Sequence, residues 1–336
     1  MNKLHKILFN LLLFIVLLIP EIGLSQQTLK ITTWNIEHLG TDGRGFGGGF
    51  GAGTLPRRTD PQLQEIGRFI KDGLQADILA LQEIGITRID NGVSRSEQLD
   101  KIVAALGTNW SYYLPPVSSI PPQTENMFNA ILWNTQRVNR LNIFPMDAPD
   151  IELADKPLFK RKPIFAYFEV INNGSGTNDF LLINVHLASG QHNDENHLIA
   201  MTVLEHGIRR QLGANSIKES DRIILGDFND NPYATTGSGK QKFTKALYSY
   251  MDFKGYKDLV TSDFHSTRVD NNLTSVIDHI LVSKSAKRHL EQDKAEIHLP
   301  SGTDNSRFVN WRRNFSDHFP ISIKIKIENS DDDVDF

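Results

Sequence analysis

The sequence contains no cysteine among its 336 residues. Disulfide bonds and thiolate zinc sites are therefore excluded. A lipid-anchored lipoprotein is excluded too, because the lipid would need a cysteine. A chain of this length can instead be stabilised by a hydrophobic core. The N-terminal hydrophobic run, residues 7–19, is broken only by Asn10. It is shorter than the ~20 apolar residues of a membrane-spanning helix.

This short run lies in a segment with the three parts of a secretory signal peptide. Lys3 and Lys6 precede the run, and Pro20 and the small residues of 23–25 follow it. We therefore expect residues 1–25 to be a signal peptide and the protein to be secreted or periplasmic. The mature chain would then have no membrane span; an uncleaved anchor is the alternative. A disulfide-free exported chain is typical of a bacterial envelope or exported protein.

The chain also lacks an excess of positive charge. It has 36 Lys and Arg against 40 Asp and Glu, a formal net charge of −4. Removal of Lys3, Lys6 and Glu21 with the signal peptide lowers this charge to about −5. Such a balance argues against binding to nucleic acid through bulk basicity alone. A local basic groove or a bound metal ion could still supply positive charge.

The remaining chain alternates short β-rich segments with a few amphipathic helical ones. We expect helices at 60–73, 96–106 and 195–212. We expect strands at 29–35, 77–82, 130–133, 163–171, 180–185, 222–225, 276–282 and 321–327. This pattern predicts an α/β fold in which two mixed or antiparallel β-sheets pack face to face with helices outside. No change in composition marks a second domain, so we expect one domain over 26–328 and an acidic tail over 329–336.

Polar side chains stand at the ends of several of these strands. Each alone could be an ordinary turn residue or a satisfied core residue. Asp278 is harder to explain in that way, because a carboxylate inside an apolar strand costs several kcal/mol unless it is paired or bound to metal. The Asn, Asp and Glu oxygens suit Mg²⁺, Mn²⁺ or Ca²⁺, whereas the lack of cysteine argues against zinc. The residues are Asn35, Glu83, His186, Asp227, Asn229, Asp278, Asp317 and His318.

Seven short motifs resemble those of the endonuclease/exonuclease/phosphatase superfamily, the deoxyribonuclease I-like fold. Any one of them is weak, but all seven occur in the family's order over nearly the whole mature chain. The resemblance implies a four-layered α/β sandwich. The motifs are TTWNI (32–36), LALQEI (79–84), KRKP (160–163), INVHLAS (183–189), ILGDFND (224–230), SVIDHILVS (275–283) and SDHFPI (316–321).

The resemblance also implies a role for each polar residue. Asn35, Glu83 and Asp317 would surround a divalent metal, with Glu83 as the principal carboxylate ligand. Asp227 would activate water or bind a second metal. Asn229 would donate a hydrogen bond to a phosphate oxygen. A metal in such a site neutralises phosphate charge and stabilises the leaving oxygen.

The remaining implied roles concern the histidines and one arginine. Asp278 would pair with His318 and fix its tautomer. His186 would hydrogen-bond a phosphate oxygen or protonate the leaving group. Arg161 would contact phosphate, although an exposed arginine in a basic run is almost as good an interpretation. Some family members pair a glutamate with the histidine at position 186, and here Glu125 or Asn129 could serve. Structural or surface roles are expected for His38, His192, His197 and His279.

We therefore expect a metal-dependent phosphodiester hydrolase, a secreted nuclease with DNA as its substrate and Mg²⁺ (or Mn²⁺ or Ca²⁺) as its cofactor. No stable protein partner is implied. An alternative is a phosphatase or a sphingomyelinase-type phospholipase, for whose membrane-inserting aromatic hairpin only Phe46 and Phe50 are candidates. A non-catalytic binding protein is disfavoured by the complete set of ligands. Residues that could help to bind nucleic acid are Tyr112, Tyr113, Arg57, Arg58, Arg209, Arg210, Arg312 and Arg313.

Overall fold

A computed structural model describes most of the chain beyond the N-terminal segment. The predicted signal peptide and acidic tail lie outside the described residues, as do Phe46, Phe50, Glu125 and His192. The described residues are 28–41, 43–44, 55–116, 127–146, 152–153, 156–172, 175–190, 194–234, 240–264, 266–269, 274–302 and 306–327.

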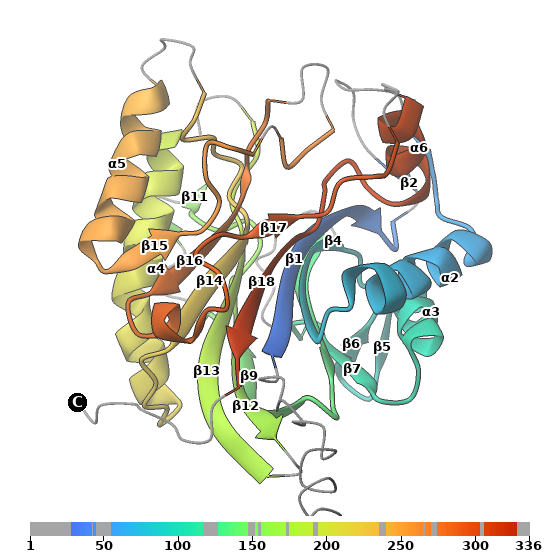
Figure 1. Cartoon of the computed structure of the whole chain (residues 1–336), viewed down its shortest axis with the longest axis horizontal. Coiled ribbons are helices and arrows are strands. Elements are labelled where there is room, and N and C mark those ends of the chain that lie inside the picture. The colour runs from blue at the N-terminus through green and yellow to red at the C-terminus, as the bar shows by residue number, and fades with distance from the viewer. Residues whose placement is uncertain are drawn as a thin grey trace, which may run out of the picture.

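Two six-stranded mixed sheets form the centre of the molecule (Figure 1). The first has the order β17 (Glu296–Ile297), β18 (Ile321–Lys326), β1 (Thr28–Leu39), β4 (Ile78–Ile84), β8 (Phe128–Asn134) and β7 (Trp110–Tyr113). The second has the order β15 (Tyr256–Asp258), β16 (Asp278–Ser283), β14 (Arg222–Asp227), β13 (Ser175–His186), β12 (Ile164–Asn172) and β9 (Val138–Pro145). Three short hairpins are β2–β3 (Gly43–Arg44, Leu55–Pro56), β5–β6 (Arg88–Asp90, Val93–Arg95) and β10–β11 (Glu152–Leu153, Lys156–Pro157).

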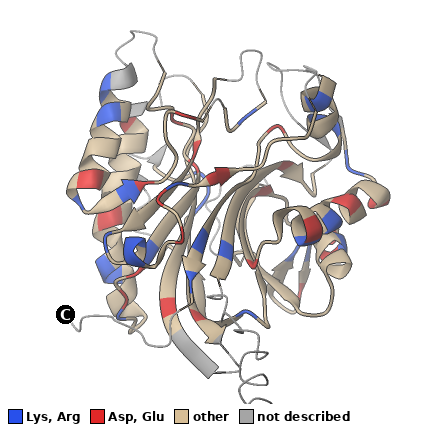
Figure 2. Cartoon of the chain, viewed as in Figure 1, with Lys and Arg blue, Asp and Glu red and all other residues tan. Residues whose placement is uncertain are grey.

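Helices cover the outer face of each sheet, which gives four layers. The first sheet is covered by α2 (Asp60–Arg68), α3 (Glu97–Leu106) and α6 (Ser306–Asn314), the second by α4 (Asp194–Ala214) and α5 (Lys240–Phe253). A π-helical turn, Phe69–Leu74, extends α2, and a 3₁₀ turn spans Ala286–His289. Figure 2 shows positive and negative side chains interspersed along the helices.

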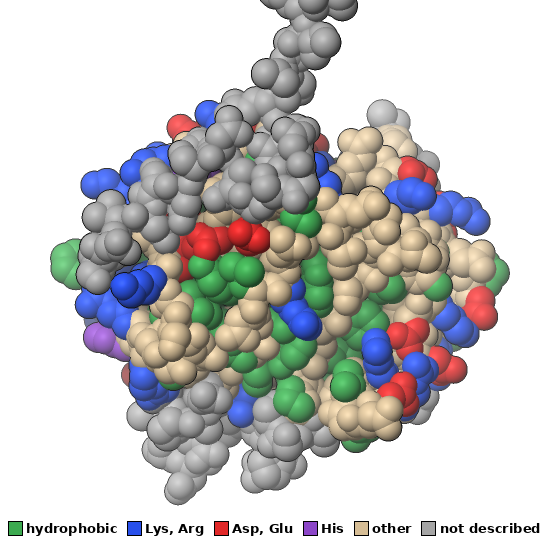
Figure 3. Space-filling view, turned by 90° about the horizontal axis from the view of Figure 1, so that it is seen from below, with side chains coloured by type: hydrophobic (Ala, Val, Ile, Leu, Met, Phe, Trp, Pro, Cys, Tyr) green, Lys and Arg blue, Asp and Glu red, His purple; other side chains and the backbone are tan. Residues whose placement is uncertain are grey.

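None of the described helices is both long enough and apolar enough to cross a bilayer. Figure 3 views the end of the sandwich that is lowest in Figure 1, where hydrophobic side chains lie among polar and charged ones.

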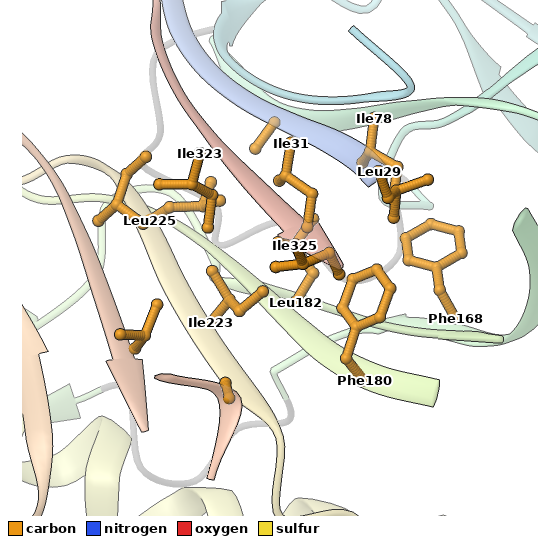
Figure 4. Close-up of a cluster of buried hydrophobic side chains, with 14 of the residues drawn as sticks. Leu29, Ile31, Ile78, Phe168, Phe180, Leu182, Ile223, Leu225, Ile323 and Ile325 are labelled. Carbon is orange, nitrogen blue, oxygen red and sulfur yellow. The ribbon is translucent and has the colours of Figure 1, made fainter. Parts of the chain in front are cut away.

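The two sheets are joined by a core of aliphatic and aromatic side chains that alternate along each strand. Strand β18 shows the pattern clearly, because Ile323 and Ile325 point inward from alternate positions (Figure 4). Leu29 and Ile31 on β1 and Leu225 on β14 meet them in the same cluster (Figure 4). Side chains of a strand alternate between its two faces, so the outer faces are free to pack on the helices.

The predicted α/β sandwich is confirmed, but several elements differ from the prediction. Strands β7, β9, β15 and β17 were not expected. Helices α5 and α6 were not expected, because each buries few apolar residues: Leu247 and Met251 on α5, Phe308 and Trp311 on α6. In addition, Asp278 is the first residue of β16 and does not lie inside a strand over 276–282. The carboxylate is therefore at the end of the sheet, where polar residues from other strands also lie.

Candidate active site

The predicted polar residues meet at one end of the sandwich because of strand direction. Strands β1 and β4 run parallel in one sheet, and β13 and β14 run parallel in the other. The carboxyl ends of these four strands lie at the same end of the sandwich, at the top of Figure 1, where Asn35 of β1 bonds Asp227 of β14. Strand β16 runs antiparallel to β14, so its first residue lies at this edge too. The register aligns His186 with Asp227 and Asp227 with Asp278 across three neighbouring strands.

The backbone at this edge adopts conformations that are uncommon for residues other than glycine. Glu37, His38, Glu83 and Asn229 have φ angles of 50°, 53°, 65° and 49°. Positive φ costs free energy in such residues, and they cluster where the surrounding structure fixes functional side chains. The pairing of β1 with β4 also shifts register between Asn35 and Leu39. These irregularities end the sheet locally and turn side chains toward a common space.

That space is a cavity of about 470 Å³. Seven of the nine predicted site residues line it, and the other two, Asn35 and Asp278, reach it through hydrogen bonds to lining residues. The full lining is Glu37, His38, Thr41, Glu83, Met127, Arg161, His186, Ser189, Asp227, Asn229, Arg268, Asp317 and His318.

The amide of Asn35 joins carboxylates from the two sheets. Its Nδ2 donates to Glu83 Oε1 at 3.0 Å and to Asp227 Oδ2 at 2.9 Å. Its Oδ1 accepts the backbone N–H of Glu37 at 3.0 Å. The second oxygen of Glu83 accepts the backbone N–H of His38 at 3.1 Å. Asn35 thus holds Glu83 and Asp227 at a fixed separation across the cleft between the sheets.

His318, which precedes β18, is held by the buried carboxylate of Asp278 at the start of β16 in the other sheet. Its Nδ1 lies 2.8 Å from Asp278 Oδ2, and its Nε2 lies 3.8 Å from Asp227 Oδ2 and 3.9 Å from Asp317 Oδ1. Burial lowers the pKa of His318, but the three carboxylates outweigh burial and raise the pKa to about 10. The raised pKa favours the imidazolium form of His318 at neutral pH. The predicted partnership of Asp278 with His318 is present as a direct contact.

Two further groups in the cavity have shifted proton affinities. Burial, and next the charge of Asp278, raise the pKa of Asp227 to about 6. Burial, and next the charge of Arg161, hold the pKa of His186 well below its usual value. His186 Nε2 lies 3.4 Å from Asp227 Oδ2. A neutral imidazole and an imidazolium, His186 and His318, thus flank one carboxylate.

Arg268 was not identified from the sequence and lies on the cavity wall. Its Nε and Nη2 donate to Asp317 Oδ2 at 3.1 and 2.9 Å. Burial raises the pKa of Asp317, but His318 and Arg268 outweigh burial and lower it. Nothing in the sequence around Arg268 marked it, because it lies in a loop that no predicted element includes.

His38 and Glu37 were also missed as site residues. His38, expected to be structural or exposed, lines the cavity with its Nε2 3.6 Å from Glu83 Oε2. Glu37 lines it too and forms a buried ion pair with Arg312 at 3.1 Å. His197 and His279 are buried outside the cavity lining, as expected of structural residues: His197 Nε2 lies 2.7 Å from Ala188 O.

Several residues considered for nucleic-acid binding have other surroundings. Arg312 is buried on Glu37, and Arg58 is buried and donates to the backbone oxygens of residues 36, 37 and 315. Neither is an exposed cation, so that expectation was wrong for both. Tyr112 donates to Asp100 at 2.6 Å and, like Tyr113, lies outside the cavity lining. Arg57 pairs with Glu97 on the surface, and Arg209, Arg210 and Arg313 are exposed.

Of the two residues predicted to pair with His186, Asn129 lies among the described residues. Asn129 is buried, and its Nδ2 donates to Lys162 O at 3.0 Å. Among the described residues, His186 Nδ1 has no hydrogen-bond partner. Glu125 lies outside these residues, so the pairing of His186 stays a prediction.

Comparison with known proteins agrees with this geometry. Residues 32–318 match the Endonuclease/Exonuclease/phosphatase family. The chain belongs to this family. The match runs from the strand that carries Asn35 to His318, so it includes every element that contributes to the cavity. No curated protein matches the chain.

Solved structures of similar fold include three with high coverage. A family protein from Bacteroides thetaiotaomicron is 16% identical, with a TM-score of 0.56 and coverage of 90% of this chain and 96% of that one. The human nocturnin catalytic domain with bound sulfate is 15% identical, with a TM-score of 0.54 and coverage of 90% and 94%. ANGEL2, a 2′,3′-cyclic phosphatase, is 13% identical, with a TM-score of 0.55 and coverage of 90% and 96%. At these identities the likeness concerns the fold alone.

The donor set in this family member fits a divalent metal ion. Possible ligand atoms of Asp227, Asp278 and His318 lie within 4.8 Å of one another, and all three residues are buried, but His318 could ligate only after losing its proton. Asp278 Oδ1 is buried without a hydrogen-bond partner among the described residues. Glu83 and Asp317 add hard oxygen atoms to the same cavity. Such a concentration of buried carboxylate oxygens is stable only with compensating positive charge, which Mg²⁺ or Mn²⁺ would provide.

Proposed function

We propose that this chain is an exported nuclease that hydrolyses phosphodiester bonds in DNA with the help of a divalent metal ion. The observation that supports it most is the aligned row of His186, Asp227 and Asp278, with His318 bonded to Asp278, at the edge cavity. Carboxylates, a neutral imidazole and cations converge there on one space large enough for a phosphate ester.

Glu83 and Asp317 would hold the metal through carboxylate oxygens, with Asp227 beside them. Asn35 would fix the distance between Glu83 and Asp227 through the two bonds that its amide donates. Asn35 itself could ligate only after its amide turns, because its Nδ2 and not its Oδ1 faces the carboxylates of Glu83 and Asp227. When bound, the metal would neutralise phosphate charge and stabilise the leaving oxygen.

The chain's own residues would orient the phosphate and manage protons. Asn229 donates one amide N–H to Leu187 O, and the group has a second N–H for a phosphate oxygen. His318, held as a cation by Asp278, can stabilise charge that develops on phosphate. His186 is neutral, so it suits hydrogen bonding to a phosphate oxygen better than protonation of the leaving group. Asp227, next to His186, can accept a proton from the attacking water.

DNA is favoured over other phosphate esters on one ground. The N-terminal segment predicts export, which suits the degradation of extracellular DNA. The net charge of −4 opposes binding of a polyanion, so attraction would depend on the metal and on local cations such as Arg161 and Arg268.

The test is a substrate panel with purified residues 26–336 and Mg²⁺. Plasmid DNA, RNA, sphingomyelin and inositol phosphates would be assayed in parallel, each with and without EDTA. We expect EDTA-sensitive cleavage of DNA. Turnover of inositol phosphates or sphingomyelin with DNA intact would contradict the nuclease proposal and indicate a phosphatase or a phospholipase instead. Binding without turnover of any substrate would indicate a non-catalytic member of the family.

A further inference from the structure

Arg268 stands among the carboxylates of the cavity in a position fixed by the backbone. Val269 N–H donates to Asp317 O at 2.6 Å, and Phe319 N–H donates to Thr267 O at 2.8 Å. Arg268 thereby lies directly across from His318 in an isolated antiparallel bridge. These hydrogen bonds fix the short segment 266–269 against the residues that precede β18, which include Asp317. The guanidinium lies in the cavity because the main chain holds it there.

Arg268 bonds only one of the two carboxylate oxygens of Asp317. Both donors of Arg268, Nε and Nη2, bind the same oxygen, Asp317 Oδ2. A guanidinium has five N–H donors in a planar fork, so these two contacts use fewer than half of them. The side chain of Arg268 is 36% exposed, whereas that of Asp317 is 9% exposed. An arginine that served only to pair with Asp317 could form two parallel bonds to the two oxygens, which is the stronger arrangement.

The negative charge of the surrounding carboxylates explains why the guanidinium of Arg268 lies in the cavity when no substrate is bound. Burial lowers the pKa of Arg268, but Asp317, and more weakly Asp227 and Glu83, outweigh burial and raise it. The guanidinium therefore neutralises part of the carboxylate cluster. A divalent cation at the same carboxylates would take over this neutralisation and repel the guanidinium.

We propose that Arg268 is a phosphate-binding residue, held by Asp317 in the substrate-free cavity and available to a substrate phosphate once a divalent cation occupies the carboxylates. The inference rests on the proposed function, because it assumes that the cavity binds metal and a phosphate ester. Guanidinium donors match phosphate oxygens in geometry and charge. The cavity would then offer phosphate two arginines, Arg161 and Arg268, both on its lining.

A simpler role for Arg268 makes the opposite prediction for metal binding. If Arg268 only orients Asp317 as a metal ligand, its loss should weaken metal binding, as loss of a supporting residue commonly does by roughly 10- to 100-fold. If Arg268 competes with the metal for Asp317, its loss should strengthen metal binding in the absence of substrate. The two roles are therefore separable without any activity assay.

The experiment measures two affinities for the purified wild type, Arg268→Gln and Arg268→Lys. Titration calorimetry gives the Kd for Mn²⁺ without substrate and the Kd for inorganic phosphate at saturating Mg²⁺. Arg88→Gln is the matched control, because Arg88 Nε also bonds a carboxylate, Asp90 Oδ2 at 2.8 Å, outside the cavity lining. Thermal unfolding of each variant shows whether it is folded.

We expect Arg268→Gln to bind Mn²⁺ more tightly than wild type and phosphate about 10-fold or more weakly, the effect of a lost charge-assisted hydrogen bond. Arg268→Lys, which keeps the charge, should recover part of the phosphate affinity. Unchanged phosphate affinity, or weaker Mn²⁺ binding, in folded Arg268→Gln would overturn the inference. Because phosphate and Mn²⁺ are the probes, the inference can hold even if the wild type does not cleave DNA.

Discussion

At the scale of single residues, the site joins carboxylates to cations that the protein itself supplies. Asn35 links Glu83 with Asp227, and Asp278 holds His318 as an imidazolium beside them. Removal of one partner from a buried pair leaves an uncompensated group, so each such change should have a large effect. Two predictions test these pairings directly.

The first concerns Glu83, which we expect to be the main carboxylate ligand of the metal. Glu83→Gln keeps the shape of the side chain but removes its negative charge. Because metal charge is worth several kcal/mol to the reaction, hydrolysis should fall at least ~10²-fold. The measurement is kcat/KM over a Mg²⁺ series. Full activity of this variant at low Mg²⁺ would remove Glu83 from the metal site.

The second concerns Asp278 and His318, which should act as one unit. We expect Asp278→Ala and His318→Ala each to lower kcat strongly, and the double variant to lose little more than either alone. Their contact of 2.8 Å is the reason, because either change abolishes the same imidazolium. The three variants would be compared at saturating metal. Losses that multiply would show that the two residues act independently.

At the scale of elements, the ends of the strands position the site. Gly226 is the clearest case: its φ is 143°, and a Cβ added there would lie 1.9 Å from Val185 O on β13. Any side chain would therefore separate β13 from β14 next to Asp227. Strand β14 closes against β13 only because residue 226 is glycine.

Gly226→Ala should accordingly destabilise the fold by about 2 kcal/mol or more, from the unfavourable φ and the clash. Gly213→Ala on α4 is the control, since no atom lies within 4 Å of its added Cβ and its φ is not positive. That variant should be neutral or slightly stabilising. Urea unfolding measures both, and equal stability of the two variants would contradict the packing argument.

The helices and strands also show which parts of the fold could be predicted from the sequence. Alternation predicted β18, and the strand-end residues predicted one cluster, because side chains at the carboxyl ends of parallel strands meet at one edge. Helices α5 and α6 were missed because their apolar stripes are narrow. Arg268 was missed because a loop residue's place is set by tertiary contacts, here the bridge between Arg268 and His318. His38 was missed because it lies in an irregular part of β1, where the register shifts and its φ is positive.

At the scale of the whole molecule, stability should depend on pH through a histidine outside the cavity lining, His298. His298 Nε2 lies 2.8 Å from Ser322 Oγ. Burial, and next the charge of Lys30, lower the pKa of His298 to about 4, although Glu296 opposes this. In the unfolded chain His298 has its ordinary pKa of about 6.5. Between pH 6.5 and 4 only the unfolded state takes up this proton, so the contribution to stability is lost as pH falls.

His298→Gln should remove this part of the pH dependence. The free energy of unfolding, measured in urea from pH 4 to 7, should fall more steeply toward acid for the wild type than for the variant. The two curves should run parallel above pH 7, where the histidine is neutral in both states. Parallel curves over the whole range would show that His298 titrates normally in the folded protein.

The central claim is that this carboxylate-rich cavity acts on DNA despite a net charge of −4 for the whole chain. If the metal and local arginines supply the attraction, kcat/KM on duplex DNA should fall steeply as NaCl rises, with a log–log slope of about −0.9 for each neutralised phosphate. A small phosphate ester should respond much less. The deciding measurement is therefore kcat/KM on duplex DNA and on an inositol phosphate across a salt series at fixed Mg²⁺. We predict efficient, salt-sensitive cleavage of DNA; DNA left intact at low salt while the inositol phosphate turns over would contradict the claim.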